Sequence, residues 1–168
     1  MFEKYGEFNS AEELNRAAAK KKEEGDLEAL IELAIENGLE KEDAEDYMSG
    51  FMPDLCNTVM AGVGKLKVES ANMRLEREFE MLEKELEVMC LKNPEVAAGV
   101  RKKGKSLAEY LAKIIDKGYK DAVAPPKEIL AKVTAVPSQY RQHIKTGMPD
   151  KLSRTEIMKE YYCGEVSK

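Results

Sequence analysis

Apolar residues at helical spacing divide the first fifty residues into three predicted helices. Ser10 and Glu13 form a capping box that opens a helix over residues 11–24. A second helix is indicated by apolar positions three or four residues apart: Leu27, Leu30, Ile31, Ala34 and Ile35. Together with a third helix over residues 41–49, they predict a small helical module over residues 1–50.

A heptad pattern occupies the centre of the chain, in a predicted segment over residues 51–93. Asn72 holds one core position of this pattern. Apolar side chains hold the other a and d positions: Val68, Leu75, Phe79, Leu82, Leu86 and Met89. We therefore predict one long helix over residues 65–92 that ends at Asn93-Pro94. The pattern fits a helix packed in its own core, and it also fits the seam of a homodimer in which Asn72 sets the register.

The last segment, residues 94–168, is also predicted to be helical. Ser106 and Glu109 form a second capping box, and an apolar stripe follows it: Leu107, Tyr110, Leu111, Ile114 and Ile115. Prolines and glycines then delimit three further predicted helices: residues 127–136, 138–145 and 153–163. The sequence therefore predicts an all-α fold, made of three segments that form either separate modules or one composite domain.

Charge is distributed unevenly along the chain. The formal net charge is -5, but residues 1–50 hold 6 basic and 15 acidic side chains, and residues 93–168 hold 15 basic and 9 acidic ones. We therefore expect an acidic N-terminal helical module and a basic C-terminal helical module. Such a chain can meet a basic surface with one end and an acidic surface with the other.

The densest acidic cluster lies on the third predicted helix: Glu40, Glu42, Asp43, Glu45 and Asp46. It lacks the order of ligands of a calcium-binding loop and the apolar surroundings of a catalytic carboxylate pair. The pattern fits two interpretations: a solvated helix face, and a docking face whose carboxylates take the place of phosphates in a basic groove.

The densest basic cluster lies in the C-terminal segment: Arg101, Lys102, Lys103 and Lys105. It fits a patch that contacts nucleic acid or an acidic partner, and it also fits an ordinary solvated loop between helices.

Several common chemistries lack the residues that they need. His143 is the only histidine, which excludes a metal site built from several histidines in one chain. The segment from Gly62 to Lys65 is not a phosphate-binding loop, because Val59 replaces the first glycine and Leu66 replaces the Ser or Thr. Three widely separated cysteines suit reduced thiols: Cys56, Cys90 and Cys163. Because no apolar run approaches roughly 18 residues, we expect a cytoplasmic protein. Because no acid, base, nucleophile or metal ligands form a recognisable set, we also expect no enzyme activity, metal or cofactor.

Two stretches of the N-terminal segment carry a family resemblance: EFNSAEELNRAAAKKKEEGD and LAIENGLEKEDAEDYMSG. They resemble the type II-A anti-CRISPR proteins, which are Cas9 inhibitors from phage and mobile elements of gut Firmicutes. The resemblance covers residues 1–50 and extends loosely to KSLAEYLAKIID and MKEYYCG in the C-terminal segment.

The resemblance implies a protein in the cytoplasm of the host bacterial cell that binds Cas9, with or without guide RNA, and blocks target-DNA binding or cleavage. The acidic segment is compatible with this role, because Cas9 holds nucleic acid in a positively charged channel. The alternative is a mobile-element accessory protein, a helical dimer that binds nucleic acid through its basic C-terminal half.

Overall fold

The computed structural model describes residues 2–164, which fold into ten α-helices and a short π-helix. Within this range the chain forms no sheet, and one isolated antiparallel bridge pairs Val123 with Thr146. The prediction of an all-α fold is confirmed.

Three helices form the N-terminal part of the molecule: α1 (Ala11–Glu23), α2 (Leu27–Glu36) and α3 (Lys41–Ser49). Local capping explains where they begin, since the Ser10 hydroxyl accepts a hydrogen bond from the Glu13 N–H at the start of α1. The helices begin and end within one residue of the predicted bounds. Their apolar faces enclose a first core that includes Leu14, Leu30, Leu33, Ala34 and Tyr47.

A second core is built by the helices that follow: α4 (Thr58–Met73), α5 (Glu78–Lys92), α6 (Pro94–Arg101), α7 (Leu107–Lys120), α10 (Lys151–Met158) and the π-helix η1 (Lys159–Cys163). Its buried side chains include Leu66, Leu82, Leu86, Val100, Ile114 and Tyr162. Helix α4 takes part in both cores, because Ala61 is buried in the first and Leu66 in the second. One helix therefore joins the two halves of the body.

The predicted single helix over residues 65–92 is wrong. The chain reverses between α4 and α5, which pack against each other. Arg74 and Arg77 both have a φ of 53°, in the left-handed region, and they bracket the reversal. Folding back lets the apolar residues of both helices share one core, whereas a straight helix would leave part of them exposed.

The heptad residues consequently lie in different environments. Leu82 and Leu86 are buried in the core of the same chain, while Asn72 and Phe79 are exposed. They form no continuous seam. A homodimer through the central helix remains a prediction, without the long helix on which it was based.

Glycines let α4 approach two neighbouring segments closely. A Cβ at Gly62 would lie 2.6 Å from the carbonyl oxygen of Ala97 in α6. A Cβ at Gly64 would likewise lie too close to the backbone of Asn37 and Gly38, which follow the end of α2. The segment with the glycines of a phosphate loop is therefore an interior turn of α4, and its glycines serve helix packing.

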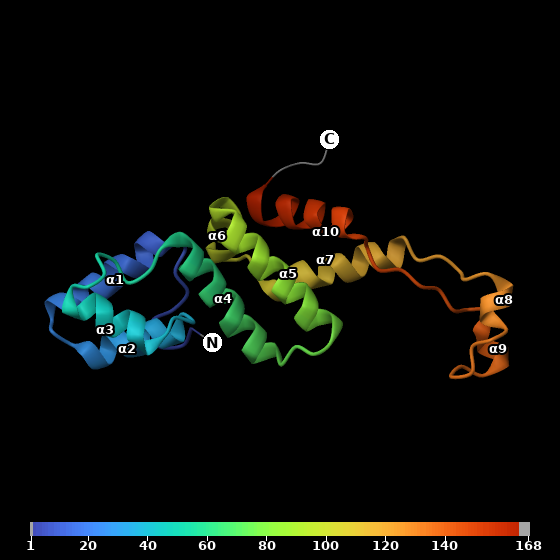
Figure 1. Cartoon of the computed structure of the whole chain (residues 1–168), viewed down its shortest axis with the longest axis horizontal. Coiled ribbons are helices and arrows are strands. Elements are labelled where there is room, and N and C mark those ends of the chain that lie inside the picture. Colours follow the sequence, from blue (N-terminus) through green and yellow to red (C-terminus); the bar gives the residue numbers. More distant parts are fainter. Residues whose placement is uncertain (1, 165–168) are drawn as a thin grey trace.

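Residues 122–148 form an arm that leaves the body after α7. The arm contains two four-residue helices, α8 (Lys127–Leu130) and α9 (Ser138–Arg141), so the predicted helices over residues 127–136 and 138–145 were too long. None of its residues is buried, and short helices without tertiary packing are not extended in water. Figure 1 shows the arm projecting from the end of α7, at the opposite end of an elongated molecule from α1, α2 and α3.

Backbone contacts hold the root of the arm. Val123 and Thr146 exchange two hydrogen bonds of 3.0 Å each. Gly147 lies so close to Gly118 and Ala122 that it has no room for a Cβ. The two chain segments of the arm therefore leave the body side by side.

The close contact at Gly62 gives a test of the fold. In an open helix Gly62→Ala would stabilise the protein by about 1 kcal/mol, but here the new methyl group meets the backbone of α6. We expect a net loss on the order of 1 kcal/mol or more, because overpacking costs about 1–3 kcal/mol. Urea unfolding followed by circular dichroism measures it. The exposed Ala71 on the same helix provides the control, Ala71→Gly, which should lose about 0.5–1 kcal/mol of stability through its lower helix propensity. A Gly62→Ala variant that is more stable than the unsubstituted protein would contradict the packing described.

Candidate interaction surfaces

A buried lysine lies where four segments of the chain meet. Lys65 of α4 is fully buried. Its ammonium donates to the carbonyl oxygens of Lys102 at 2.9 Å and Lys105 at 2.6 Å and contacts the carboxylate of Glu7. An ammonium has three N–H donors and no acceptor, so each donor finds one oxygen. Glu69, one turn further along α4, adds a second carboxylate at 3.8 Å.

Arg101 is the second buried cation of this region, which corrects its predicted place in a surface patch. Its side chain is fully buried at the end of α6, and its Nη2 donates to Oδ1 of Asn37 at 2.5 Å. The rings of Phe2 and Phe8 lie 5.8 Å and 6.0 Å from the guanidinium carbon. Burial lowers the pKa of Arg101. Its Nε and Nη1 have no hydrogen-bond partner among residues 2–164, and the two rings lie close enough to add a cation–π attraction.

Glu69 completes the buried polar cluster. Its carboxylate accepts a hydrogen bond from the Leu107 N–H at 2.6 Å, which caps the first turn of α7. Burial raises the pKa of Glu69, and the nearby charge of Lys65 counteracts this only in part. The cluster therefore links the N-terminal segment, α4, α6 and the start of α7.

Sequence reasoning missed this buried cluster. Lys65 and Arg101 each lie one turn after a buried alanine, Ala61 and Ala97, on the same helix face. A cation on an apolar helix face was the signal in the sequence. It does not reveal which oxygens meet the cation, because these come from distant segments.

The predicted basic patch is thus reduced to a smaller surface. Lys102 and Lys103 are exposed, whereas Lys105 is half-buried with its Nζ 4.5 Å from the ring centroid of Tyr161. The loop turns inward with its backbone, since the carbonyls of Lys102 and Lys105 bind Lys65. Two of the four predicted cations are left to face a partner freely.

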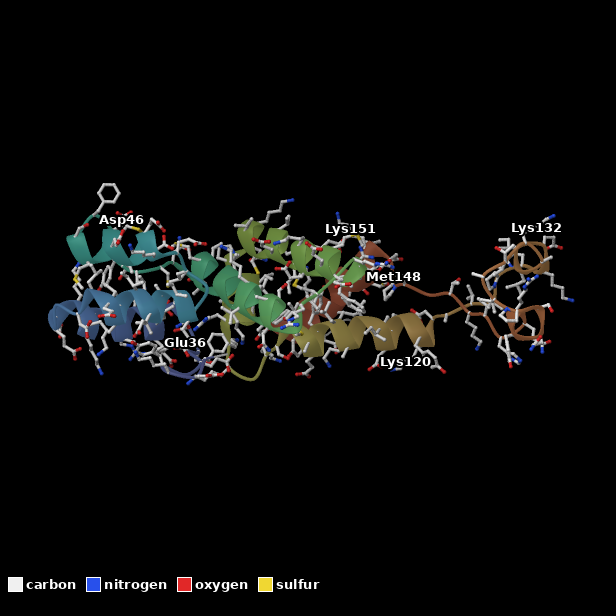
Figure 2. The ribbon with its side chains drawn as sticks, turned by 90° about the horizontal axis from the view of Figure 1, so that it is seen from below. Glu36, Asp46, Lys120, Lys132, Met148 and Lys151 are labelled. Atoms are coloured by element: carbon white, nitrogen blue, oxygen red, sulfur yellow. The ribbon has the colours of Figure 1, made fainter. Side chains whose placement is uncertain are left out.

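The acidic cluster lies on α3 and at its start, as predicted, and part of it is used locally. The Asp43 carboxylate accepts a hydrogen bond from the Glu40 N–H at 2.9 Å. Glu40 pairs with Lys67 at 3.1 Å, and Glu45 pairs with Lys41 at 2.9 Å. Glu42 and Asp46 are exposed, and neither carboxylate has an ion-pair partner within the described part of the chain. In Figure 2 Asp46 lies at the end of the molecule opposite to Lys132 of the arm.

The arm presents apolar and basic side chains together. Its exposed large apolar residues are Val123, Ile129, Tyr140 and Met148. Four cations, Lys127, Lys132, Arg141 and Lys145, outnumber the single acid Glu128. His143 is also exposed there, beside Gln142. Side chains of this kind on a segment without a core are typical of a surface that packs on a partner.

Two of the three cysteines are buried. Burial raises the pKa of Cys56 and of Cys90 to about 12, so both stay protonated at neutral pH. Between residues 2 and 164, no three side chains of His, Cys, Asp or Glu come together in a way that could hold a metal ion. None of the described helices is both long and apolar enough to cross a membrane.

Comparison of the chain with protein-family models, with curated proteins and with solved structures gave no match.

The buried lysine predicts a large and specific stability effect. Lys65→Met leaves the Glu7 and Glu69 carboxylates and two carbonyls without their cation. We expect a loss of about 3–5 kcal/mol, as for other broken buried ion pairs, measured by urea unfolding. The exposed neighbour in the loop provides the control, Lys102→Met, which should change stability by less than about 0.5 kcal/mol. Equal effects of the two substitutions would show that Lys65 is not the buried centre of this region.

Glu69 predicts a dependence of stability on pH. Because its pKa is raised in the folded protein, the ionised carboxylate costs stability at neutral pH. This cost is relieved as the pH falls through the raised pKa toward the ordinary value of 4.5. Glu69→Gln keeps an acceptor for the Leu107 N–H and does not titrate. The difference in unfolding free energy between the variant and the unsubstituted protein should favour the variant more at about pH 8 than at about pH 5. Urea unfolding of both proteins at both pH values measures this difference, and the same difference at the two pH values would refute the prediction.

Proposed function

We propose that this chain is a stoichiometric binding protein that inhibits Cas9, the role implied by the resemblance of residues 1–50 to type II-A anti-CRISPR proteins. The observation that carries the proposal is the arm, residues 122–148. The body already has two buried cores, yet the arm extends from it without burying a single residue. Folding alone does not account for such a segment, because its ordering gains no apolar burial. Contact with a partner would provide the apolar burial that the arm lacks.

The charges at the two ends support a partner that contains both protein and nucleic acid. Glu42 and Asp46 of α3 present carboxylates that are not neutralised by neighbouring cations. Such carboxylates can compete with phosphates for the positively charged channel in which Cas9 holds its heteroduplex. The arm carries four cations against one acid, which suits a phosphate backbone. A guide-loaded complex offers both surfaces at once.

The same cations favour a second candidate function, a nucleic-acid-binding accessory protein of a mobile element. Lys127, Lys132, Arg141 and Lys145 would contact phosphates in this case, and binding would weaken steeply with salt. The two functions differ in what the acidic end does. It is required for a Cas9 inhibitor and irrelevant to a simple nucleic-acid binder.

Replacing the arm tests the proposal directly. Val123 and Thr146 are already a hydrogen-bonded antiparallel pair, so residues 124–145 can be replaced by Asn-Gly, which closes a two-residue hairpin. We expect this variant to keep its thermal stability, because no buried residue is removed. It should lose inhibition of DNA cleavage by guide-loaded Cas9 by about tenfold or more in the concentration required. Unsubstituted protein that leaves cleavage unaffected at several-fold molar excess would sink the proposal.

Charge reversal separates the two candidate functions. Glu42→Lys combined with Asp46→Lys should weaken Cas9 inhibition more than Lys102→Glu combined with Lys103→Glu, because the acidic face docks in a basic channel. All four positions are exposed, so folding should be unaffected. If the acidic substitutions change nothing while mobility shifts show DNA or RNA binding by the arm, the accessory-protein function is favoured instead.

A further inference from the structure

A cavity of about 320 Å³ lies between α5 and α10, away from both charged ends. Leu86, Met89 and Met158 form its apolar inner wall. At the mouth, Met81 and Val88 are 53% and 44% exposed. Its volume is at the lower end of the range of small-ligand sites, about 300–1,000 Å³.

A tyrosine whose hydroxyl is accessible lines this cavity. Tyr110 of α7 is 3% exposed, and its ring packs on Tyr162 with centroids 5.6 Å apart. Among the residues that the structure describes, its hydroxyl forms no hydrogen bond. Tyr110 shares the lining of the cavity with Glu85 and Arg154. Burial raises the pKa of Tyr110 to about 12, which keeps the hydroxyl a donor at neutral pH.

The cavity is surrounded by positive charge. Lys84, Lys92, Lys151 and Arg154 line it together with one acid, Glu85. Two of these cations are paired: Arg154 binds both oxygens of Glu85, at 2.8 Å and 3.0 Å, and Lys84 pairs with Glu87 at 2.8 Å and with Glu83 at 3.5 Å. Lys92 and Lys151 are exposed and have no ion-pair partner in the described part of the chain. A ligand that enters between the lysines therefore meets an attractive potential only if it is anionic.

We propose that this cavity is a binding site for a small anionic amphiphile. An apolar body of about ten carbon atoms fits a space of this size and lies against Leu86, Met89 and Met158. A carboxylate or sulfonate head remains at the mouth near Lys92 and Lys151, and the Tyr110 hydroxyl donates to a polar atom of the ligand. This site is independent of Cas9 inhibition and would function in the free protein.

Fluorescence of anilinonaphthalene sulfonate, itself an anionic amphiphile, provides the measurement on the full chain. The dye should bind saturably, at one molecule per chain, and decanoate should displace it. Decylammonium should be at least about tenfold weaker, because it presents the same chain with the opposite charge. Each methylene added between octanoate and dodecanoate should improve displacement by about fourfold until the cavity is filled.

Two exposed positions test the location without disturbing the fold. Val88→Glu places a carboxylate at the mouth and should weaken decanoate binding by about tenfold or more. Leu91→Glu, at an exposed position on the same helix outside the cavity lining, is the matched control and should change little. Lys151→Glu should reproduce the loss at the opposite wall, and Tyr110→Phe should weaken binding by several-fold. Circular dichroism confirms that each variant is folded.

Four outcomes would overturn the proposal. Equal displacement by decanoate and decylammonium, or binding that Val88→Glu and Lys151→Glu leave unchanged, would show that the dye reports general apolar surface. Binding to phosphatidylglycerol vesicles without displacement by free decanoate would indicate a membrane surface. Failure of decanoate combined with loss of Cas9 inhibition in Val88→Glu would make the groove a protein-docking face. Because the dye assay contains no Cas9, its failure leaves the proposed function untouched.

Discussion

The contact between the Lys65 ammonium and its oxygens holds the two halves of the body in place. A fully buried ammonium is costly unless each N–H donor is satisfied, and here the oxygens come from Glu7, Lys102 and Lys105. These positions are far from Lys65 in the sequence, so one cation determines where the N-terminal segment and the loop after α6 lie relative to α4. Arg101, the second buried cation beside it, is less well satisfied: Nη2 donates to Asn37 and two aromatic rings lie nearby, while Nε and Nη1 have no hydrogen-bond partner among the described residues.

Helix α4 can reach these partners because its glycines remove side chains at the crossings. Gly62 admits α6 and Gly64 admits the end of α2, which places Lys65 between them. This arrangement also changes the surface. The carbonyls of Lys102 and Lys105 point inward and bind Lys65, and the exposed cations that remain on this loop are Lys102 and Lys103. Further charged residues that are free to meet a partner lie at the two ends of the molecule, on α3 and on the arm (Figure 2).

Local signals made the first three helices and α7 predictable, since capping residues and apolar spacing act within one or two turns. The reversal at Arg74 and Arg77 was not predictable from the heptad pattern, because an apolar stripe fits a partner helix on another chain or on the same chain equally well. The length of α8 and α9 depends on tertiary packing that the arm does not have. The sequence predicted that the acidic cluster lies on a helix, and α3 carries it, whereas burial of Arg101 depends on Asn37, 64 positions away.

The two ends of the molecule differ in how they can bind. Helix α3 packs on a core through Ala44 and Tyr47, and Lys22 of α1 contacts the Tyr47 carbonyl at 2.5 Å. Its free carboxylates are therefore held on a rigid support and lose little freedom on binding. The arm has a fixed root at Val123 and Thr146 but no buried residue beyond it, so holding it in one arrangement against a partner costs conformational entropy. Charge on the rigid end would then set the orientation of a complex. The apolar and basic residues of the arm would add contacts afterwards, and they would add affinity only where the free energy gained by their burial exceeds this entropic cost.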